Sequence, residues 1–300
     1  MKYLIYLYLF NLTQCLSFII PSSTITNIKS TKRITYSRTI LDSSLFDTSL
    51  LDSSLFANFK TALLTNGVGY YGLSNSNQTS LSDNGLLHSA ILGISLMTFL
   101  DINGYIYCVS YFILGSLVTK IKFNQKQNEG IAESNNGMRE PKNVWGSAAV
   151  AMICAISSYI YSDYSEIFKI GYVSSLSAKL ADTFQSEIGK AYGNTTFLIT
   201  NFTKVSRGTE GAISLEGTLA GILGSIILIL EGYKLNLIDN YSAILICFIS
   251  SQFATFCESY IGATFQDKYL NNELVNFINT FIAAIISMLI LFLLKTPPVI

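Results

Sequence analysis

The residues of this sequence that are best suited to chemistry include two carboxylates inside a largely apolar stretch, Asp182 and Glu187 of ADTFQSEIG (181–189). On a helix, Asp182 would share one face with Lys179 and Ser186, and Glu187 would lie on the adjoining face. A charged side chain at membrane depth costs about 2.5–3.5 kcal/mol on insertion scales, so it normally faces a cavity, an ion or an opposite charge. The stretch therefore indicates either a functional site or a pairing of Asp182 with Lys179 or Ser186 that holds helices together.

A second segment, TKVSRGTEGAISLEGTLAGILG (203–224), has the composition of a phosphate cradle. Two cations precede a turn rich in Gly, Thr and Ser that opens an apolar helix. Glycines let a backbone approach an anion closely, and the amides at a helix N-terminus point toward it. The alternative is an interfacial loop with snorkelling basic residues, followed by a helix face of small packing residues. From this segment we predict site roles for Lys204, Arg207, Gly208, Thr209, Gly211, Glu216 and Thr218.

A third segment, ESYIGATFQDKYLNNELVNFINT (258–280), combines an acid with a row of amides. Asparagines at 272, 276 and 279 follow helical spacing and line one face. Asparagine in a membrane span commonly bonds one helix to another, which is the alternative to a site, but this does not account for Glu258. We predict that Glu258, Gln266 and Asn276 contribute to the site.

A fourth segment, REPKNVWGSAA (139–149), precedes and opens an apolar helix. Pro141 and Asn143 are typical of an extended start to a helix near Val144. Arg139 and Lys142 are candidate phosphate contacts, or a positively charged flank of the helix.

The elements that must position these residues are membrane helices. Half of the 300 residues are apolar and only 13% are charged, so a soluble domain of this length would lack the polar surface to cover itself. We therefore predict an all-α, polytopic integral membrane bundle of six or seven transmembrane helices in the lipid bilayer. Four spans are clear, and two shorter segments split by Asp101 and Asn103 suggest a helical hairpin. The clear spans are 144–161, 213–230, 237–255 and 275–294, and the short segments are 86–100 and 104–119.

The segment 168–188 decides the topology, because it has a helical apolar pattern but carries Lys179, Asp182 and Glu187. If it crosses the membrane, the loops 120–143, 190–211 and 257–273 all lie on one side. These loops hold almost all the motif-like polar residues, and a site needs them together. This favours seven helices.

Several functions are excluded by what the sequence lacks. Lys plus Arg equals Asp plus Glu at 19 each, so no net charge attracts nucleic acid, and we predict no nucleic-acid partner. Five scattered cysteines without a C-x-x-C pair and one histidine, His88, argue against zinc, haem and Ser/His catalysis. No P-loop motif is present, so a nucleotide would be held in another way.

The first part of the chain is predicted to be a targeting sequence. Residues 1–17 have the pattern of a signal peptide, and residues 18–66 are rich in Ser and Thr, with no acid before Asp42, as in a transit peptide. This resembles the two-part address of proteins imported into plastids with extra membranes. We expect a disordered transit segment at 18–66, a membrane domain at 67–300 and a plastid membrane location.

Four segments in order, NVWGSAA, SLSAKLADTFQSEIG, RGTEGAISLEGTLAG and ESYIGATFQ, resemble the integral membrane family that contains transmembrane protein 19 and chloroplast phytyl-phosphate kinase. The resemblance covers residues 85–296. The NVWGSAA stretch and a Glu at Glu258 are similar to the plastid and cyanobacterial branch. The sequence departs from the family pattern at Ala212, Gln185 and Lys179, which bears on donor binding.

For that branch the resemblance implies transfer of a phosphoryl group from a nucleoside triphosphate to phytyl monophosphate, giving the diphosphate used for tocopherols and related prenyl lipids. It implies Mg²⁺ bridging the phosphates, with Asp182, Glu187, Glu216 and Glu258 as candidate metal ligands. Lys204 and Arg207 would neutralise charge in the transition state. The full set of expected site residues is catalytic Asp182, Lys204, Arg207 and Glu258, with substrate contacts from Ser186, Gly208, Thr209, Gly211, Thr218, Gln266 and Asn276.

Other functions compete with this one. A transporter or channel would use Asp182, Glu187 and Glu258 as an ion pathway through the bundle. A membrane scaffold would use the same residues as polar glue between helices. Another prenyl-phosphate transferase is a closer neighbour of the kinase hypothesis.

Overall fold

The computed structural model describes residues 53–75, 80–266 and 269–295. The expected signal peptide (1–17) and the expected transit segment as far as residue 52 lie outside the described residues. The first described helix, α2 (Ser53–Ser74), runs across the boundary expected between residues 66 and 67.

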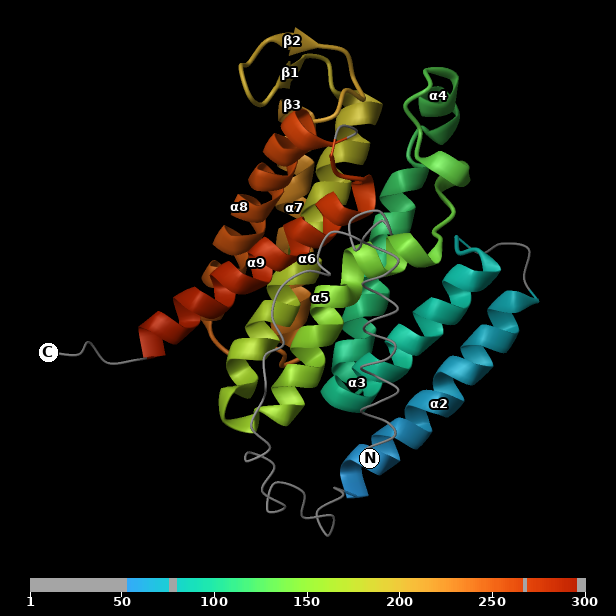
Figure 1. Ribbon diagram of the computed structural model, residues 1–300, viewed down its shortest axis with the longest axis vertical. Helices are drawn as coiled ribbons and strands as arrows, with labels where there is room; N and C mark the ends of the chain where they lie inside the picture. The colour runs from blue at the N-terminus through green and yellow to red at the C-terminus, as the bar shows by residue number, and fades with distance from the viewer. Residues whose placement is uncertain (1–52, 76–79, 267–268, 296–300) are drawn as a thin grey trace, which may run out of the picture.

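The described chain is a helical bundle with a small sheet at one end (Figure 1). Five of its helices, α3, α5, α7, α8 and α9, are long and apolar enough to cross a membrane. The predicted all-α polytopic membrane fold is therefore confirmed, while the number of crossings, six or seven, stays a prediction. The helices after α2 are α3 (Asp83–Lys120), α4 (Phe123–Asn128), η4 (Ser134–Gly137), α5 (Pro141–Ile160), η5 (Ser162–Tyr164), α6 (Ser165–Tyr192), α7 (Leu215–Lys234), α8 (Tyr241–Phe265) and α9 (Asn272–Lys295).

Helix α3 bends back on itself between its two apolar halves, and its arms form a V (Figure 1). Leu100 and Asp101 have non-helical backbone angles, with Asp101 at φ 56°. A straight helix would set Gly93 and Tyr105 about 18 Å apart. Instead, the Tyr105 ring lies 2.9 Å from the point where a Gly93 side chain would begin. The hairpin expected from the polar break in the sequence is thus present.

Helix α6 occupies the middle of the bundle and packs against α3, α5, α7, α8 and α9. Every residue from Ile170 to Thr183 is buried. Because its neighbours surround it, α6 does not need an apolar face toward lipid, which explains how it can carry charged residues.

The segment between α6 and α7 folds into three short antiparallel strands, whereas the sequence pattern suggested only a glycine-rich turn. The order is β2-β1-β3, and Thr196 pairs with Val205 on one side and Ser214 on the other. β-Branched residues favour strands, and the short strands lie on the end of the bundle (Figure 1). Their bounds are β1 Thr196–Leu198, β2 Lys204–Val205 and β3 Ala212–Ser214.

The three polar connections meet at this same end of the bundle. They are the segment from α4 to the start of α5, the sheet before α7, and the turn from α8 to α9 (Figure 1). Residues from all three line one cavity. This is the convergence expected if the segment 168–188 passes from one end of the bundle to the other.

Candidate functional site

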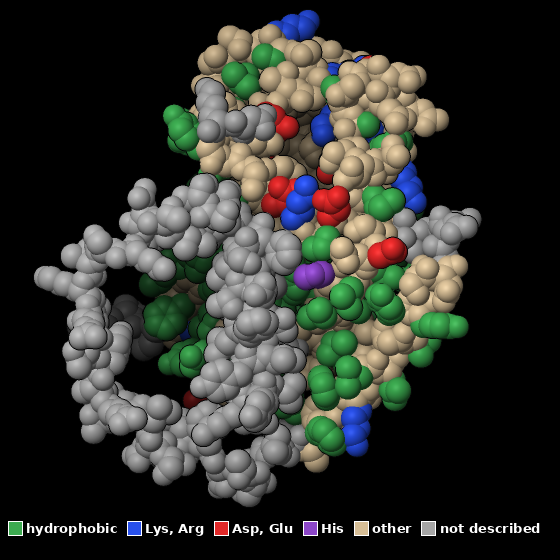
Figure 2. Space-filling view, turned by 45° about the vertical axis from the view of Figure 1, so that its right-hand side comes forward, with side chains coloured by type: hydrophobic (Ala, Val, Ile, Leu, Met, Phe, Trp, Pro, Cys, Tyr) green, Lys and Arg blue, Asp and Glu red, His purple; other side chains and the backbone are tan. Residues whose placement is uncertain are grey.

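A cavity of about 430 Å³ lies where the three connections cover the upper half of α6. We call it the polar cavity. Figure 2 shows charged side chains gathered near a hollow toward this end and hydrophobic side chains lower on the bundle. Nine of the residues singled out in the sequence line it: Asp182, Ser186, Glu187, Gly208, Thr209, Gly211, Glu258, Gln266 and Asn276.

Asp182 is paired, as one alternative drawn from the sequence expected, and it is also part of the cavity wall, so its role in a functional site stays a prediction. Lys179 Nζ lies 2.5 Å from Asp182 Oδ2, one helical turn away, and 2.7 Å from Asn276 Oδ1 of α9. Glu258 of α8 interacts electrostatically with both Asp182 and Lys179. The arrangement places two carboxylates and one ammonium group together in the wall, with Asp182 and Lys179 buried and Glu258 half-buried.

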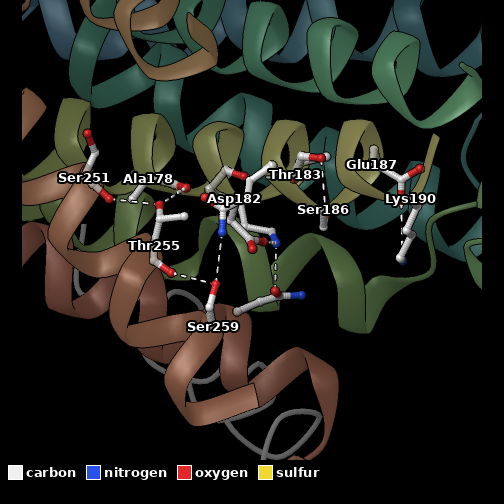
Figure 3. Close-up of polar contacts among 12 residues, drawn as sticks. Ala178, Asp182, Thr183, Ser186, Glu187, Lys190, Ser251, Thr255 and Ser259 are labelled. Atoms are coloured by element: carbon white, nitrogen blue, oxygen red, sulfur yellow. Dashed lines mark hydrogen bonds and ion pairs between the residues drawn. The ribbon is translucent and has the colours of Figure 1, made fainter. Parts of the chain in front are cut away.

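Hydroxyl groups hold α6 and α8 together beside these charges, and Figure 3 shows Ser251, Thr255 and Ser259 along α8 next to α6. The Thr255 hydroxyl donates to the carbonyl of Ser251 at 2.9 Å and lies 3.4 Å from that of Ala178. Gln185 Nε2 donates to Ser259 Oγ at 3.0 Å. These bonds fix the distance between the helix that carries Asp182 and the helix that carries Glu258.

Glu187 is balanced by two lysines. Lys126 of α4, 1% exposed, forms an ion pair with it and donates to the carbonyl of Thr119 at 2.9 Å. Lys190 Nζ lies 3.7 Å from Glu187 Oε1. Lys126 was not singled out in the sequence, where it stands in a polar loop with no pattern that links it to α6.

The loop before α7 closes one side of the cavity through tight backbone contacts. Gly211 has φ +71°, and a side chain there would begin 2.4 Å from Ala263 Cβ of α8. Only glycine fits both conditions, so this loop is pressed against α8 near Ser259. Outside the lining, Arg207 Nη2 donates to both carboxylate oxygens of Glu129 at 2.8 and 2.7 Å.

Four of the expected site residues, Lys204, Arg207, Glu216 and Thr218, do not line the cavity. Lys204 lies on the exposed strand β2, which the glycine-rich-turn interpretation did not foresee. Glu216 accepts hydrogen bonds from the backbone and side-chain nitrogens of Asn194 at 3.3 and 3.0 Å, so it fastens the start of the sheet. These four residues were expected to lie together at the site, but the structure keeps them out of the cavity lining, because the segment between α6 and α7 folds into strands.

The wall offers oxygen atoms of the kind that Mg²⁺ prefers. No three His, Cys, Asp or Glu side chains gather as a preformed metal site among the described residues. However, Mg²⁺ commonly takes one or two carboxylates and completes its shell with phosphates and water. Asp182 and Glu258 supply two carboxylates, and the buried Gln266 Oε1, which also lines the cavity, has no hydrogen-bond partner among the described residues. The donor set therefore fits Mg²⁺ carried with phosphates, and not a metal site formed by the protein alone.

A spanning helical bundle around a charged cavity at one end defines a polytopic membrane protein with a polar site near its surface. The chain belongs to the family described as integral membrane protein DUF92, which matches residues 67–284. This confirms the family membership predicted from the ordered motifs.

Three relatives cover most of the same region. The chain is 44% identical to Protein VTE6, chloroplastic, of Arabidopsis thaliana over 219 residues, which is 70% of this chain and 65% of that protein. It is 45% identical to an uncharacterized membrane protein of Synechocystis over 67% of this chain and 78% of that protein. An uncharacterized membrane protein of Methanocaldococcus jannaschii is 36% identical over 70% of this chain and 85% of that protein. No solved structure matches the chain.

Proposed function

We propose that this protein is a prenyl-phosphate kinase that transfers a phosphoryl group from a nucleoside triphosphate to phytyl monophosphate or a similar prenyl monophosphate. The observation that carries the proposal is the charge of the polar cavity. Its described lining has five carboxylates, from Glu133, Asp182, Glu187, Glu210 and Glu258, against three cations.

An excess of carboxylates repels phosphate groups unless divalent cations accompany them. A site that binds Mg²⁺ together with a triphosphate meets this condition. Asp182 and Glu258, with the amide oxygen of Gln266, would hold the ion, which supplies charge neutralisation between the two phosphate groups.

The reaction needs little acid or base chemistry from the protein. An oxygen of the prenyl monophosphate, already anionic, attacks the γ-phosphorus and forms a new P–O bond. The bond from the γ-phosphorus to its bridging oxygen breaks, and the nucleoside diphosphate leaves with that electron pair. The only histidine, His88, accepts a hydrogen bond from Trp145 and does not line the cavity, in keeping with a reaction that requires no proton abstraction.

The family and the relatives support the same proposal. The family resemblance implies a phytyl-phosphate kinase, and a relative whose name places it in the chloroplast shares 44% identity. We propose a plastid membrane location and Mg²⁺ with a nucleoside triphosphate as the donor. Because the match covers 65% of that relative, its whole activity is transferred here only as a proposal.

The test is conversion of radiolabelled phytyl monophosphate to the diphosphate by the purified full chain in detergent, with Mg²⁺ and each of four nucleoside triphosphates. We expect product with a preferred nucleotide. Asp182→Asn should lower the turnover number by about 10²–10³, the cost of losing one group that stabilises transition-state charge.

The matched control is Asp163→Asn, because Asp163 is an exposed acid in η5 and does not line the polar cavity. It should turn over like the unmodified chain. Absence of product with all four nucleotides, from protein with an intact cooperative unfolding transition, would overturn the kinase proposal and favour an ion-coupled transporter. Near-normal turnover of Asp182→Asn would remove Asp182 from the mechanism.

A further inference from the structure

An apolar groove of about 380 Å³ lies beside the polar cavity, on the side of the bundle formed by α2, α3 and the start of α5. We call it the apolar groove. Both arms of the α3 hairpin contribute to it, which is why it exists only when α3 bends at Asp101. Representative lining residues are Tyr70 of α2, Leu86, Leu96 and Phe112 of α3, and Ala148 of α5.

The groove and the polar cavity share three lining residues, Arg139, Asn143 and Ser147. All three belong to the start of α5 or the residues just before it. A molecule with an apolar chain and an anionic head can therefore place its chain in the groove and its head at these three residues, which border both cavities. We call these three residues the junction.

Arg139 is the cation of the junction, and it differs from the other cations of the cavity wall. Lys179 pairs with Asp182, and Lys190 lies near Glu187. The guanidinium of Arg139 has no hydrogen bond or ion pair with any residue that the structure describes, although Glu140 next to it pairs with Lys142. A buried or half-buried cation without a counter-ion is costly, so a ligand anion is the natural partner for it.

The backbone of Arg139 is fixed in place. Its N–H donates to the carbonyl of Ser80 at 2.9 Å, and its carbonyl accepts from Ser82 N at 3.1 Å. A side chain on Gly85 would begin 2.3 Å from this carbonyl, so glycine is required for the close approach. From this anchor the guanidinium reaches between the helices, where Nη2 lies 3.5 Å from the point where a Gly115 side chain would begin.

Tyr111 provides a second, independent sign of a ligand. It is 5% exposed, it lines the apolar groove, and its hydroxyl has no hydrogen-bond partner among the described residues. It lies one helical turn before Gly115, where Arg139 Nη2 approaches α3, which places it near the junction. A buried hydroxyl without a partner loses about 1–3 kcal/mol, which a ligand oxygen would recover.

We propose that the junction binds the phosphate of a single-chain isoprenoid monophosphate, with Arg139 as its counter-ion and Tyr111 as a hydrogen-bond donor, while the isoprenoid chain lies in the apolar groove. This deepens the proposed function, on which it rests, by assigning the acceptor substrate to residues that the sequence motifs did not group. Lys179, which pairs with Asp182, lines the same polar cavity that this phosphate would reach. The donor would occupy the part of the cavity under the loop at Gly208 and Gly211.

The chain carries a built-in reporter of groove occupancy. Trp145 is the only tryptophan and is 1% exposed, and it donates to His88 Nδ1 at 2.7 Å. Its neighbours Val144 and Ala148 line the groove. The fluorescence of the full chain should therefore change when a lipid enters, without any labelling.

The experiment is a fluorescence titration of the full chain in detergent with phytyl monophosphate, in the absence of nucleotide. We expect a saturable change, with binding of phytol at least about tenfold weaker because it lacks the phosphate. Arg139→Gln should weaken phytyl monophosphate binding by about 10- to 100-fold, and Tyr111→Phe should weaken it by about three- to tenfold. Lys234→Gln, which removes an exposed cation at the end of α7 that lines neither cavity, should bind as the unmodified chain does.

Three further outcomes test the proposed acceptor site. Equal binding by Arg139→Gln and the unmodified chain would overturn the inference, even where diphosphate is still formed. Tight binding by the unmodified chain, lost in Arg139→Gln but without any kinase activity, would uphold the site and overturn the proposed function. Phosphatidic acid or inorganic phosphate binding as tightly as phytyl monophosphate would overturn the isoprenoid assignment, and Tyr111→Phe supplies the same test should Arg139→Gln fail to fold.

Discussion

Arg207, which forms an ion pair with Glu129, has two candidate roles that predict very different losses of activity when it is replaced. The resemblance to the kinase family assigns Arg207 to charge neutralisation in the transition state. In the structure Arg207 lies outside the polar cavity lining and joins the loop before α7 to the end of α4 through Glu129. The geometry favours a clasp that holds the two loops over the cavity.

The expected effect of breaking the Arg207–Glu129 pair follows from the solvent exposure of the two side chains. The side chains are 29% and 34% exposed, so solvent screens the pair and its worth is about 1 kcal/mol or less. Loss of the clasp would change the fraction of closed loops by about fivefold at most. Loss of a transition-state cation would instead lower the turnover number by about 10²–10³.

The assay is phosphoryl transfer to phytyl monophosphate by four proteins: the unmodified chain, Glu129→Arg, Arg207→Glu, and the double charge swap. We expect each single variant to lose a few-fold in kcat/KM and the swap to recover most of it, because the pair is restored in reverse. The loss of kcat/KM in each single variant, relative to the unmodified chain at the same salt concentration, should also shrink as ionic strength rises, because salt screens the pair. A loss above a hundredfold in Arg207→Glu that the swap does not restore would refute the clasp and return Arg207 to the catalytic set.

Three other predictions concern the buried pair, the groove and the metal. Glu187→Gln should lower the free energy of unfolding by about 3–5 kcal/mol, because Lys126 would stay buried without its partner. Adding Lys126→Met should restore part of this free energy. Equal melting temperatures of Glu187→Gln and the unmodified chain would contradict the prediction. Ala90→Phe, which fills the apolar groove, should weaken binding of phytyl monophosphate more than that of a five-carbon prenyl monophosphate, whereas Leu117→Phe on the exposed side of α3 should not. Removal of Mg²⁺ by a chelator should abolish turnover and leave the Trp145 titration with phytyl monophosphate unchanged; a lost titration would mean that the metal also holds the acceptor.

Local spacing was enough to predict the contacts within one helix. Lys179 and Asp182 stand three residues apart, so a helical period alone brings them onto one face, and the structure pairs them at 2.5 Å. The break between the two halves of α3 was likewise visible as Asp101 and Asn103 inside an apolar run. The meeting of three loops at one end also followed from counting helices across the membrane.

Contacts between distant segments were not predictable in this way. Lys126 and Glu187 are 61 residues apart, and nothing in the loop around Lys126 indicates that it would be buried against α6. The sheet between α6 and α7 depends on pairing three very short strands, each too brief to show alternation in the sequence. For the same reason Lys204 and Glu216 were grouped with a cavity that they do not line.

Arg139 illustrates most clearly the difference between what sequence spacing predicts and what only the structure shows. The sequence left it as either a phosphate contact or a charged flank. Its importance depends on the pairing of its neighbours: Lys142 takes Glu140, Lys179 takes Asp182, and the guanidinium is left facing two cavities at once. Such an assignment requires every nearby counter-ion to be located in three dimensions.

The arrangement of groove and cavity answers a physical problem posed by the proposed reaction, which joins a substrate that stays in lipid to one that stays in water. Helix α2 packs mainly against α3 and exposes apolar residues such as Leu64, Val68 and Tyr71, so the outer face of the groove wall is apolar, as a surface toward lipid would be. The polar cavity opens instead under the loops at the end of the helices. An isoprenoid phosphate would therefore reach the junction without leaving the bilayer, and a nucleotide would reach it without entering one. Arg139, Lys179 and the two carboxylates beyond them stand where these two paths meet, so the charges that cost the most to bury are placed where the reaction would use them.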